Sequence, residues 1–309
     1  STWRADAERH RRESPALLEI ACPGNTGDKS ELAYPLPLGY RPSVGVGGHV
    51  DEGAYPSFFL PAKREPGPSP RDQLLDEIYE VLALGVADYF KKTGAFERLG
   101  IALSGGRDSC LCGLVAYRAV KLLHPDLEGE ALRAKCADMI GAFFMPTRYS
   151  SDATSAAAEQ LAKDIGATFM AVPIEEAFDR ERDATKTMLG GDTPSAITMQ
   201  NIQARLRGQR MWNWANSSGA LFLQTGNMSE KSVGYTTMGG DLEGCFSVIA
   251  NLPKTVVVAL LDRLLRRFDL EGVRMTLATT AGPELAADQV GEDELMPFSV
   301  LDACLYLHA

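Results

Sequence analysis

The sequence predicts an α/β fold with an open, mainly parallel sheet and helices on both faces. Short apolar runs alternate with amphipathic segments after residue 70, and a glycine loop joins the first of these runs to a helix. Apolar residues make up 45% and charged residues 23% of 309, as in ordinary globular proteins. Alternating strands and helices imply parallel strands with right-handed crossovers, so helices must cover both faces.

The elements follow in order along the chain. Ser69 can cap a helix with Pro70 in its first turn, and apolar residues then recur at helical spacing until Gly94. A short apolar strand, 99–103, enters the loop 104–109, and a helix from about 109 to 123 ends before Pro125. The same pattern predicts strands at 139–145, 168–172 and 221–225, and helices at 151–165, 174–188, 197–217 and 255–268.

Residues 1–69 differ from the rest. Prolines recur throughout, and a glycine cluster lies at 45–48, so this segment is expected to be an irregular tail or linker. It also has more aromatic and apolar residues than a solvated linker needs, so parts of it are expected to dock on a folded surface. The second region, 70–309, is expected to be the functional domain.

Charge and composition exclude several classes. Lys and Arg number 31 against 41 Asp and Glu, a net charge of −10 that argues against nucleic-acid and anionic-membrane binding. No apolar run approaches membrane-spanning length, and residues 1–13 are polar, so we expect a cytoplasmic protein without a membrane partner. The six cysteines form no C-x-x-C pair and there are four histidines, which predicts buried thiols rather than a zinc site.

The loop from Ser104 to Ser109, Ser-Gly-Gly-Arg-Asp-Ser, has the position and composition of an anion site. Gly105 and Gly106 allow close backbone approach, while helix amides and the two hydroxyls can donate to a phosphate. Asp108 would repel phosphate unless a cation such as Mg²⁺ lies between them. No Lys follows the glycines, so a Walker loop is excluded, as is a Rossmann fingerprint. The alternative is a plain strand-to-helix turn.

Two further stretches carry candidate ligands. Asn201 and Arg205 are four residues apart and share one helix face; Gln203 and Arg207 share an adjacent one. These side chains can donate hydrogen bonds to the diphosphate of a dinucleotide. The alternative is that they form a solvated basic face of the helix. Thr225 and Glu230 follow a strand end at the ligand-bearing edge, where the carboxylate can join Asp108 at Mg²⁺ or be a surface acid.

These motifs resemble a known family. The loop resembles the pyrophosphatase loop of adenine-nucleotide α-hydrolase-like enzymes, and residues 201–207 and 225–235 resemble NAD⁺ synthetases of the ammonia- or glutamine-dependent family. Asp241, the Pro-Lys-Thr run around Lys254 and the Glu284-Leu285 pair continue the resemblance in the same order. The resemblance implies ATP-dependent amidation of deamido-NAD⁺ by ammonia through an adenylate, with release of AMP and pyrophosphate.

The resemblance also implies the roles of individual residues. It implies Mg²⁺ at Asp108 and Glu230, deamido-NAD⁺ at Asn201, Arg205 and Asp241, and catalysis by Asp108, Lys254 and Asp241. ATP is expected at Ser104, Gly105, Gly106, Asp108, Ser109, Thr225 and Lys254. Alternatives are another enzyme with this loop, such as a GMP synthetase or tRNA thiolase, or a nonenzymatic adenine-nucleotide-binding module.

The chain departs from the family pattern at four positions: Gln200, Met228, Cys245 and Gly291. We expect these 309 residues not to contain the glutaminase module of longer members, so ammonia is expected to be free or to come from a glutaminase domain or subunit, of which residues 1–69 could be the end. Trp212 and Trp214 are two residues apart and cannot both face one core stripe. With the resemblance, this predicts a homodimer.

Overall fold

Five parallel strands form one sheet in the order β3-β2-β1-β4-β5. The strands are β1 (Arg98–Ala102), β2 (Ile140–Phe144), β3 (Thr168–Ala171), β4 (Ala220–Gln224) and β5 (Phe246–Ser247). The computed structural model describes residues 69–279, 282, 284–286 and 295–308. From β1 the chain adds β2 and β3 on one side and then β4 and β5 on the other, so the order of the strands reverses between β1 and β4 while all of them stay parallel. The predicted parallel sheet is confirmed.

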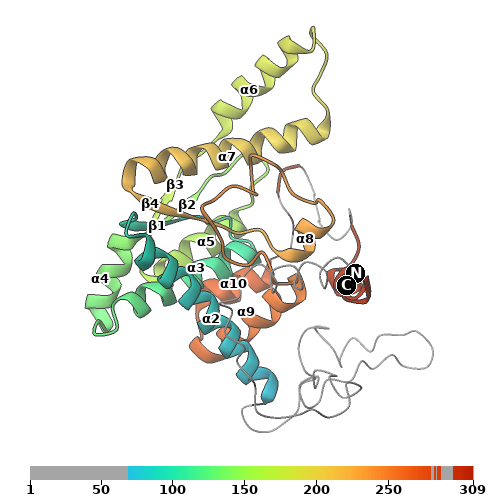
Figure 1. The fold of residues 1–309 in the computed structure, drawn as a ribbon. Coiled ribbons are helices and arrows are strands. Elements are labelled where there is room, and N and C mark those ends of the chain that lie inside the picture. Colours follow the sequence, from blue (N-terminus) through green and yellow to red (C-terminus); the bar gives the residue numbers. More distant parts are fainter. Residues whose placement is uncertain (1–68, 280–281, 283, 287–294, 309) are drawn as a thin grey trace, which may run out of the picture. The chain divides into compact units, whose positions relative to one another are not determined.

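Helices lie on both faces of the sheet, as predicted (Figure 1). Helix α7 covers one face, with α6 packed against α7 and extending away from the sheet, and α2, α3, α5, α9 and α10 lie on the other side. The described helices are α2 (Pro70–Thr93), α3 (Arg107–Leu123), α4 (Gly129–Met139), α5 (Asp152–Ile165), α6 (Glu175–Met188), α7 (Ala196–Ser218), α8 (Met228–Ser232), α9 (Lys254–Phe268), α10 (Glu271–Ala278) and α12 (Phe298–His308).

Helix ends follow the local signals of the sequence. The Ser69 hydroxyl accepts a hydrogen bond from the Asp72 amide at 3.1 Å and so caps α2 as predicted. Gly94 ends that helix with φ 58°, and Gly219 ends α7 with φ 62°, a conformation that costs glycine little. The predicted helix boundaries therefore lie within two residues of the observed ones, because they are set by neighbouring residues.

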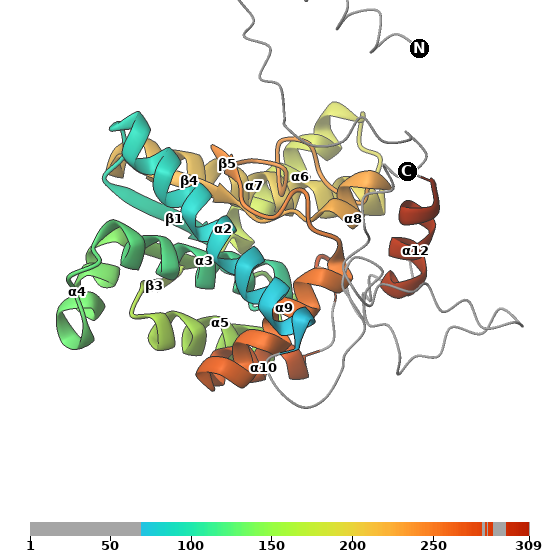
Figure 2. The ribbon, with the colours of Figure 1, turned by 60° about the horizontal axis from the view of Figure 1, so that its bottom comes forward.

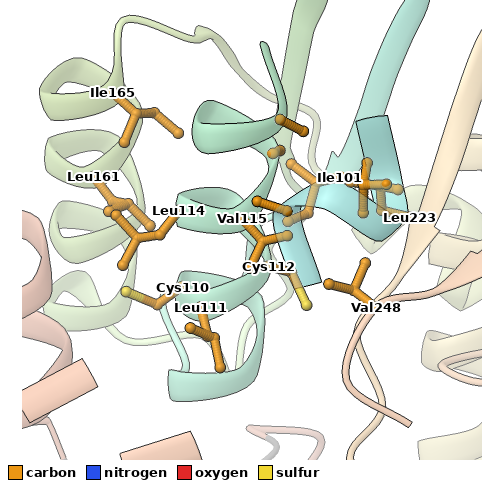
Figure 3. Close-up of a cluster of buried hydrophobic side chains, with 14 of the residues drawn as sticks. Ile101, Cys110, Leu111, Cys112, Leu114, Val115, Leu161, Ile165, Leu223 and Val248 are labelled. Carbon is orange, nitrogen blue, oxygen red and sulfur yellow. The ribbon is translucent and has the colours of Figure 1, made fainter. Parts of the chain in front are cut away.

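The main hydrophobic core lies between the sheet and the α3 face (Figure 3). Cys110 and Cys112 are fully buried in it, on different sides of α3: Cys110 faces α5 and Cys112 faces the strands. Burial raises the pKa of Cys110 to about 12. The prediction of buried thiols is confirmed for these two and for Cys136, but it is wrong for Cys304, which is exposed.

A smaller core lies between the sheet and α7. Trp212 packs edge-on against Phe222 at 5.5 Å between ring centroids, and Trp214 packs against Phe143 at 4.7 Å. Both tryptophans therefore contact the same sheet from one helix. The expectation that they cannot share one face is wrong, because a helix lying flat on a sheet brings a wide arc of side chains into contact with it.

Several elements were not expected. Helix α4 precedes β2, and Met139, expected as the first strand residue, is its last. Its apolar signal is weak, since only three residues are buried. Helices α8, α10 and α12 and strand β5 were also not predicted. Of the expected tail 1–69, only Ser69 is among the described residues. Gly291 also lies outside them.

Among the described residues, no helix is long and apolar enough to cross a membrane.

Candidate active site

The glycine loop lies at the carboxyl end of β1, in the middle of the sheet. It is shorter than expected: α3 begins at Arg107, so only Ser104, Gly105 and Gly106 lie outside regular structure. Gly105 has φ 79°, and a Cβ there would lie 2.1 Å from the carbonyl oxygen of Thr154. Only glycine fits this turn, through which the chain passes from β1 into α3.

The two serine hydroxyls hold the loop together. The Ser109 hydroxyl donates to the Gly106 carbonyl oxygen at 3.1 Å and accepts from the Ser104 amide at 3.1 Å. The Ser104 hydroxyl accepts from the Gly106 amide at 3.2 Å and lies 3.0 Å from the Ser109 hydroxyl. Ser109 is buried and Ser104 is exposed. Ser109 therefore shapes the loop, and Ser104 is the hydroxyl that solvent and ligands can reach.

Three charged residues from three elements meet beside the loop. The Lys254 ammonium, on the first residue of α9, forms an ion pair with Asp108 of α3 and lies 2.9 Å from Glu230 Oε1 of α8. Only 8% of the lysine side chain and 18% of each acid is exposed. Burial alone would lower the pKa of Lys254, but the two carboxylates outweigh it and raise this pKa above its ordinary value. Lys254 is therefore a permanent cation.

The two carboxylates do not have equal surroundings. Burial, followed by repulsion from Asp108, raises the pKa of Glu230. Asp108 Oδ1 is buried and makes no hydrogen bond within the described part of the chain. A buried carboxylate oxygen without a donor is costly unless a cation can reach it. This oxygen is thus the free ligand position of the cluster.

The residues fit Mg²⁺. This ion binds through one or two carboxylates and completes its coordination with waters and substrate phosphates. Asp108 and Glu230 supply two carboxylates next to the glycine loop, and Asp108 Oδ1 has no hydrogen-bond partner among the described residues. The described residues contain no cluster of three or more His, Cys, Asp or Glu that would hold a metal without a substrate. Asp108 and Glu230 would hold the ion together with ATP.

Asn201, Arg205 and Asp241 come together around the loop 237–241. The Thr237 hydroxyl donates to Asn201 Oδ1 at 2.7 Å, and the Thr237 amide donates to Asp241 Oδ1 at 2.6 Å. Arg205 Nε donates to the Met238 carbonyl oxygen at 3.1 Å and is exposed. Asp241 is an exposed residue, but partial burial of its carboxyl group raises its pKa.

Gln224 and Lys231 join this loop to the end of β4. Gln224 Nε2 donates to the Asp241 carbonyl oxygen at 3.3 Å, and Lys231 Nζ donates to Gln224 Oε1 at 2.9 Å. Since Thr225 follows Gln224 and Glu230 precedes Lys231, the two groups of candidate residues are linked through α8. Sequence reasoning missed Gln224 and Lys231 because their hydrogen bonds form only when the loop 237–241 returns to the end of β4.

The adjacent polar face of α7 is not solvated. Gln203 is fully buried: its Oε1 accepts from the Thr147 hydroxyl at 3.0 Å and its Nε2 donates to the Leu285 carbonyl oxygen at 2.8 Å. Arg207 Nε donates to the Met145 carbonyl oxygen at 3.0 Å, and burial lowers the pKa of Arg207 to about 10. The solvated-face interpretation is wrong for Gln203 and Arg207, which bind the chain that leaves β2.

Glu284 and Phe298 are further neighbours of the site that had no assigned role. Glu284, at φ 49°, accepts hydrogen bonds from the hydroxyls of Ser151 at 2.7 Å and Thr154 at 2.8 Å, at the start of α5. The ring centroid of Phe298 lies 5.2 Å from Lys254 Nζ. Phe298 belongs to α12, whose contact with the site no local pattern predicts.

The fold and this site define a class: α/β proteins of the ATP-pyrophosphatase type, with a glycine loop at the switch point of a parallel sheet. The family model described as NAD synthase matches residues 78–309, and the chain belongs to this family. The resemblance inferred from the motifs is confirmed.

Relatives agree with this family. A glutamine-dependent NAD(+) synthetase from Synechocystis is 36% identical over 230 residues, covering 74% of this chain and 38% of the relative. A glutamine-dependent NAD(+) synthetase from Acinetobacter baumannii, solved with ADP, is 28% identical with a TM-score of 0.59, covering 80% of this chain and 40% of that one. One from Cytophaga hutchinsonii has a TM-score of 0.61 at 26% identity, covering 69% and 40%. The chain spans about two-fifths of the length of the curated relatives it matches.

Proposed function

We propose that this chain catalyses the ATP-dependent amidation of deamido-NAD⁺ to NAD⁺, with release of AMP and pyrophosphate. The observation that carries the proposal is the meeting of Asp108, Glu230 and Lys254 beside the glycine loop, in a member of the NAD synthase family. Two carboxylates and a permanent cation next to helix amides suit a nucleoside triphosphate with its metal. The ADP in the Acinetobacter baumannii structure supports an adenine nucleotide here.

In the first step a nicotinate carboxylate oxygen attacks the α-phosphorus of ATP, and the bond to the pyrophosphate oxygen breaks. The Lys254 ammonium and the amides in the first turn of α3 stabilise the negative charge that develops on the departing pyrophosphate. Mg²⁺ held by Asp108 and Glu230 would neutralise phosphate charge. Because the carboxylate of the substrate is the nucleophile, no covalent enzyme intermediate is needed.

In the second step ammonia attacks the activated acyl carbon, and AMP leaves with the former carboxylate oxygen. Ammonium must lose a proton to become nucleophilic, and the attacking nitrogen loses another when the amide forms. Asp241 is the acid we assign to this end of the substrate, together with Asn201 and Arg205 as contacts of the dinucleotide. The raised pKa of Asp241 supports proton acceptance by this carboxylate.

The nitrogen source is proposed to be ammonia produced by a glutaminase domain or subunit, because the curated relatives are named glutamine-dependent. Those relatives are more than twice as long as the matched segment.

We further propose a homodimer, as expected from the resemblance. Exposed apolar residues at the junction of α6 and α7, Met188, Leu189 and Ile197, support a surface that a second copy covers.

The test is pyrophosphate release by the 309-residue chain with ATP, Mg²⁺ and ammonium. We expect release only when deamido-NAD⁺ is present, with NAD⁺ formed in equal amount and detected by an alcohol dehydrogenase assay. Xanthosine monophosphate, the acceptor of a GMP synthetase, is expected to give none. Release with that acceptor, or nucleotide binding without any release, would support an alternative function.

A further inference from the structure

Helix α12 packs against two helices that carry charged residues of the site, α8 and α9 (Figure 2). It lies far along the sequence from α8, and its segment is mainly apolar. One acid, Asp302, stands in the middle of this segment and is fully buried. A buried carboxylate within an apolar helix needs specific hydrogen-bond donors, and its donors identify what it holds.

Both carboxylate oxygens of Asp302 bind residues next to the charged cluster. One oxygen accepts from the Ser229 hydroxyl, one residue before Glu230. The other accepts from the Thr255 amide at 2.9 Å and the Thr255 hydroxyl at 2.6 Å, one residue after Lys254. The network closes because the Lys254 amide donates to the Ser229 hydroxyl at 2.8 Å. Asp302 thus fastens α8 and α9 to each other directly behind their charged residues.

The start of α9 needs this carboxylate. Its N-cap is Pro253, whose side chain makes no capping hydrogen bond, so the first two amides of the helix, those of Lys254 and Thr255, donate to side chains of other helices. Asp302, which belongs to α12, acts as the cap of α9 by accepting from the Thr255 amide. A negative charge at this end also offsets the unfavourable interaction of the Lys254 cation with the helix dipole.

Phe298 gives α12 a second contact with the same residue. It is four residues before Asp302, so both side chains project from the same face of α12. The Phe298 ring centroid lies 5.2 Å from the Lys254 ammonium, while Asp302 binds beside the Lys254 backbone. Helix α12 therefore contacts both ends of this lysine, which a helix that only filled the core would not do.

We propose that Asp302 is a positioning residue of the active site, which sets the placement of the Lys254 ammonium relative to Glu230 and Asp108 through Ser229 and Thr255. This inference rests on the proposed function, in which Lys254 stabilises departing pyrophosphate. Displacement of such a group by about 1 Å can lower the rate about a hundredfold, so small movements of the start of α9 are enough to affect turnover.

The experiment compares four proteins: wild type, Asp302→Asn, Lys254→Met and the double variant. Two quantities are measured, kcat for deamido-NAD⁺-dependent pyrophosphate release and the dissociation constant of Mg²⁺ with α,β-methylene-ATP by calorimetry. We expect Asp302→Asn to lower kcat about tenfold or more and to weaken analogue binding. In the Lys254→Met background, Asp302→Asn should change neither kcat nor the dissociation constant by more than about twofold, because Asp302 acts through that lysine.

Leu301→Ala is the matched control, since Leu301 is the buried neighbour of Asp302 on α12 and takes no part in the network. It is expected to lower the thermal midpoint at least as much as Asp302→Asn and to leave the kcat of folded enzyme within about twofold. An equal kcat loss in Leu301→Ala would overturn the proposal, as would a loss from Asp302→Asn that is the same in both backgrounds or is absent.

Thr255→Val keeps the proposal testable if Asp302→Asn does not fold. It removes the hydroxyl that donates at 2.6 Å and keeps the amide contact, so a smaller loss of kcat is expected, and an unchanged kcat would overturn the proposal. Wild type that binds the analogue without deamido-NAD⁺-dependent release refutes the proposed function alone, and the four proteins are then compared by analogue binding. Wild type that does not bind the analogue refutes both.

Discussion

Asp108 occupies the second position of α3, with one oxygen paired to Lys254 and the other without a hydrogen bond in the described chain. The loop beside it is held by Ser104, Ser109 and backbone groups rather than by this acid. The fold therefore does not depend on Asp108: its carboxylate contributes charge at the site, while other residues maintain the turn.

Asp108→Asn tests this independence of the fold. We expect kcat for pyrophosphate release to fall at least about a hundredfold, because the substitution removes a charge that acts on the phosphates and metal. The thermal midpoint should stay within a few degrees of wild type, since the loop contacts are kept. Asp152→Asn, an exposed acid at the start of α5, is the control. Near-normal turnover in Asp108→Asn would remove Asp108 from the site.

The cysteines differ in burial, which predicts a difference in reactivity. Burial raises the pKa of Cys110 to about 12 and that of Cys136 to about 11, so both are protonated thiols at pH 8, and the thiolate is the reactive form. Cys304 is exposed. Iodoacetamide at pH 8, followed by peptide mass spectrometry, should modify Cys304 and spare Cys110, Cys112 and Cys136 until urea unfolds the protein. Early modification of Cys110 would contradict its burial.

At the scale of elements, α7 can lie close to the sheet because two strands have glycine beneath it. A Cβ at Gly100 would lie 2.4 Å from the Trp214 ring, and one at Gly141 would lie 2.7 Å from it. These two glycines pair across β1 and β2. The indole therefore fills the space that two missing side chains leave, and the position of α7 depends on this contact.

Gly100→Ala is expected to lower the free energy of unfolding by about 1–3 kcal/mol, because the added methyl group overfills the contact with Trp214. Gly85→Ala is the matched control: its Cβ would lie 3.8 Å from the nearest atom, within a helix that favours alanine. Urea unfolding measures both. If Trp214 is the cause, Trp214→Leu should reduce the cost of Gly100→Ala, and additive effects of the two substitutions would contradict it.

At the scale of the whole molecule, α6 and the start of α7 carry apolar residues without cover from the described chain. Met188 is 86% exposed and Ile197 is 69% exposed. The tryptophans of α7, which first suggested an interface, are used within the subunit. The dimer prediction now depends on the family resemblance and on these exposed residues.

We expect sedimentation at nanomolar concentration to show a dimer whose interface exceeds about 2,000 Å² in total, as in obligate assemblies. Ile197→Glu should shift it toward monomer, because a charge would then be buried without a partner. Val81→Glu is the control, since Val81 is 65% exposed on α2. A stable and active monomer of the wild type would contradict both the dimer and a site shared between subunits.

The sequence by itself determined the features that neighbouring residues control. Apolar periodicity and caps fixed most helices and strands, as at Ser69 and Gly94, and strand-loop-helix order placed the glycine loop at the sheet edge. Motif order then identified the family. Asp108 and Glu230 could be selected in advance because they follow strand ends, where ligands of parallel sheets bind, and Lys254 was selected through the family resemblance.

Only the tertiary structure decided which residues from distant segments meet. Asp302 reaches Ser229 and Thr255 across 73 and 47 residues, and Gln203 reaches Leu285 across 82. Likewise, the anions beside Lys254 turned out to include two carboxylates of the chain itself, whereas the sequence suggested a bound triphosphate alone. Such pairs leave no periodic signal, because their contact depends on how the helices pack rather than on spacing along the chain.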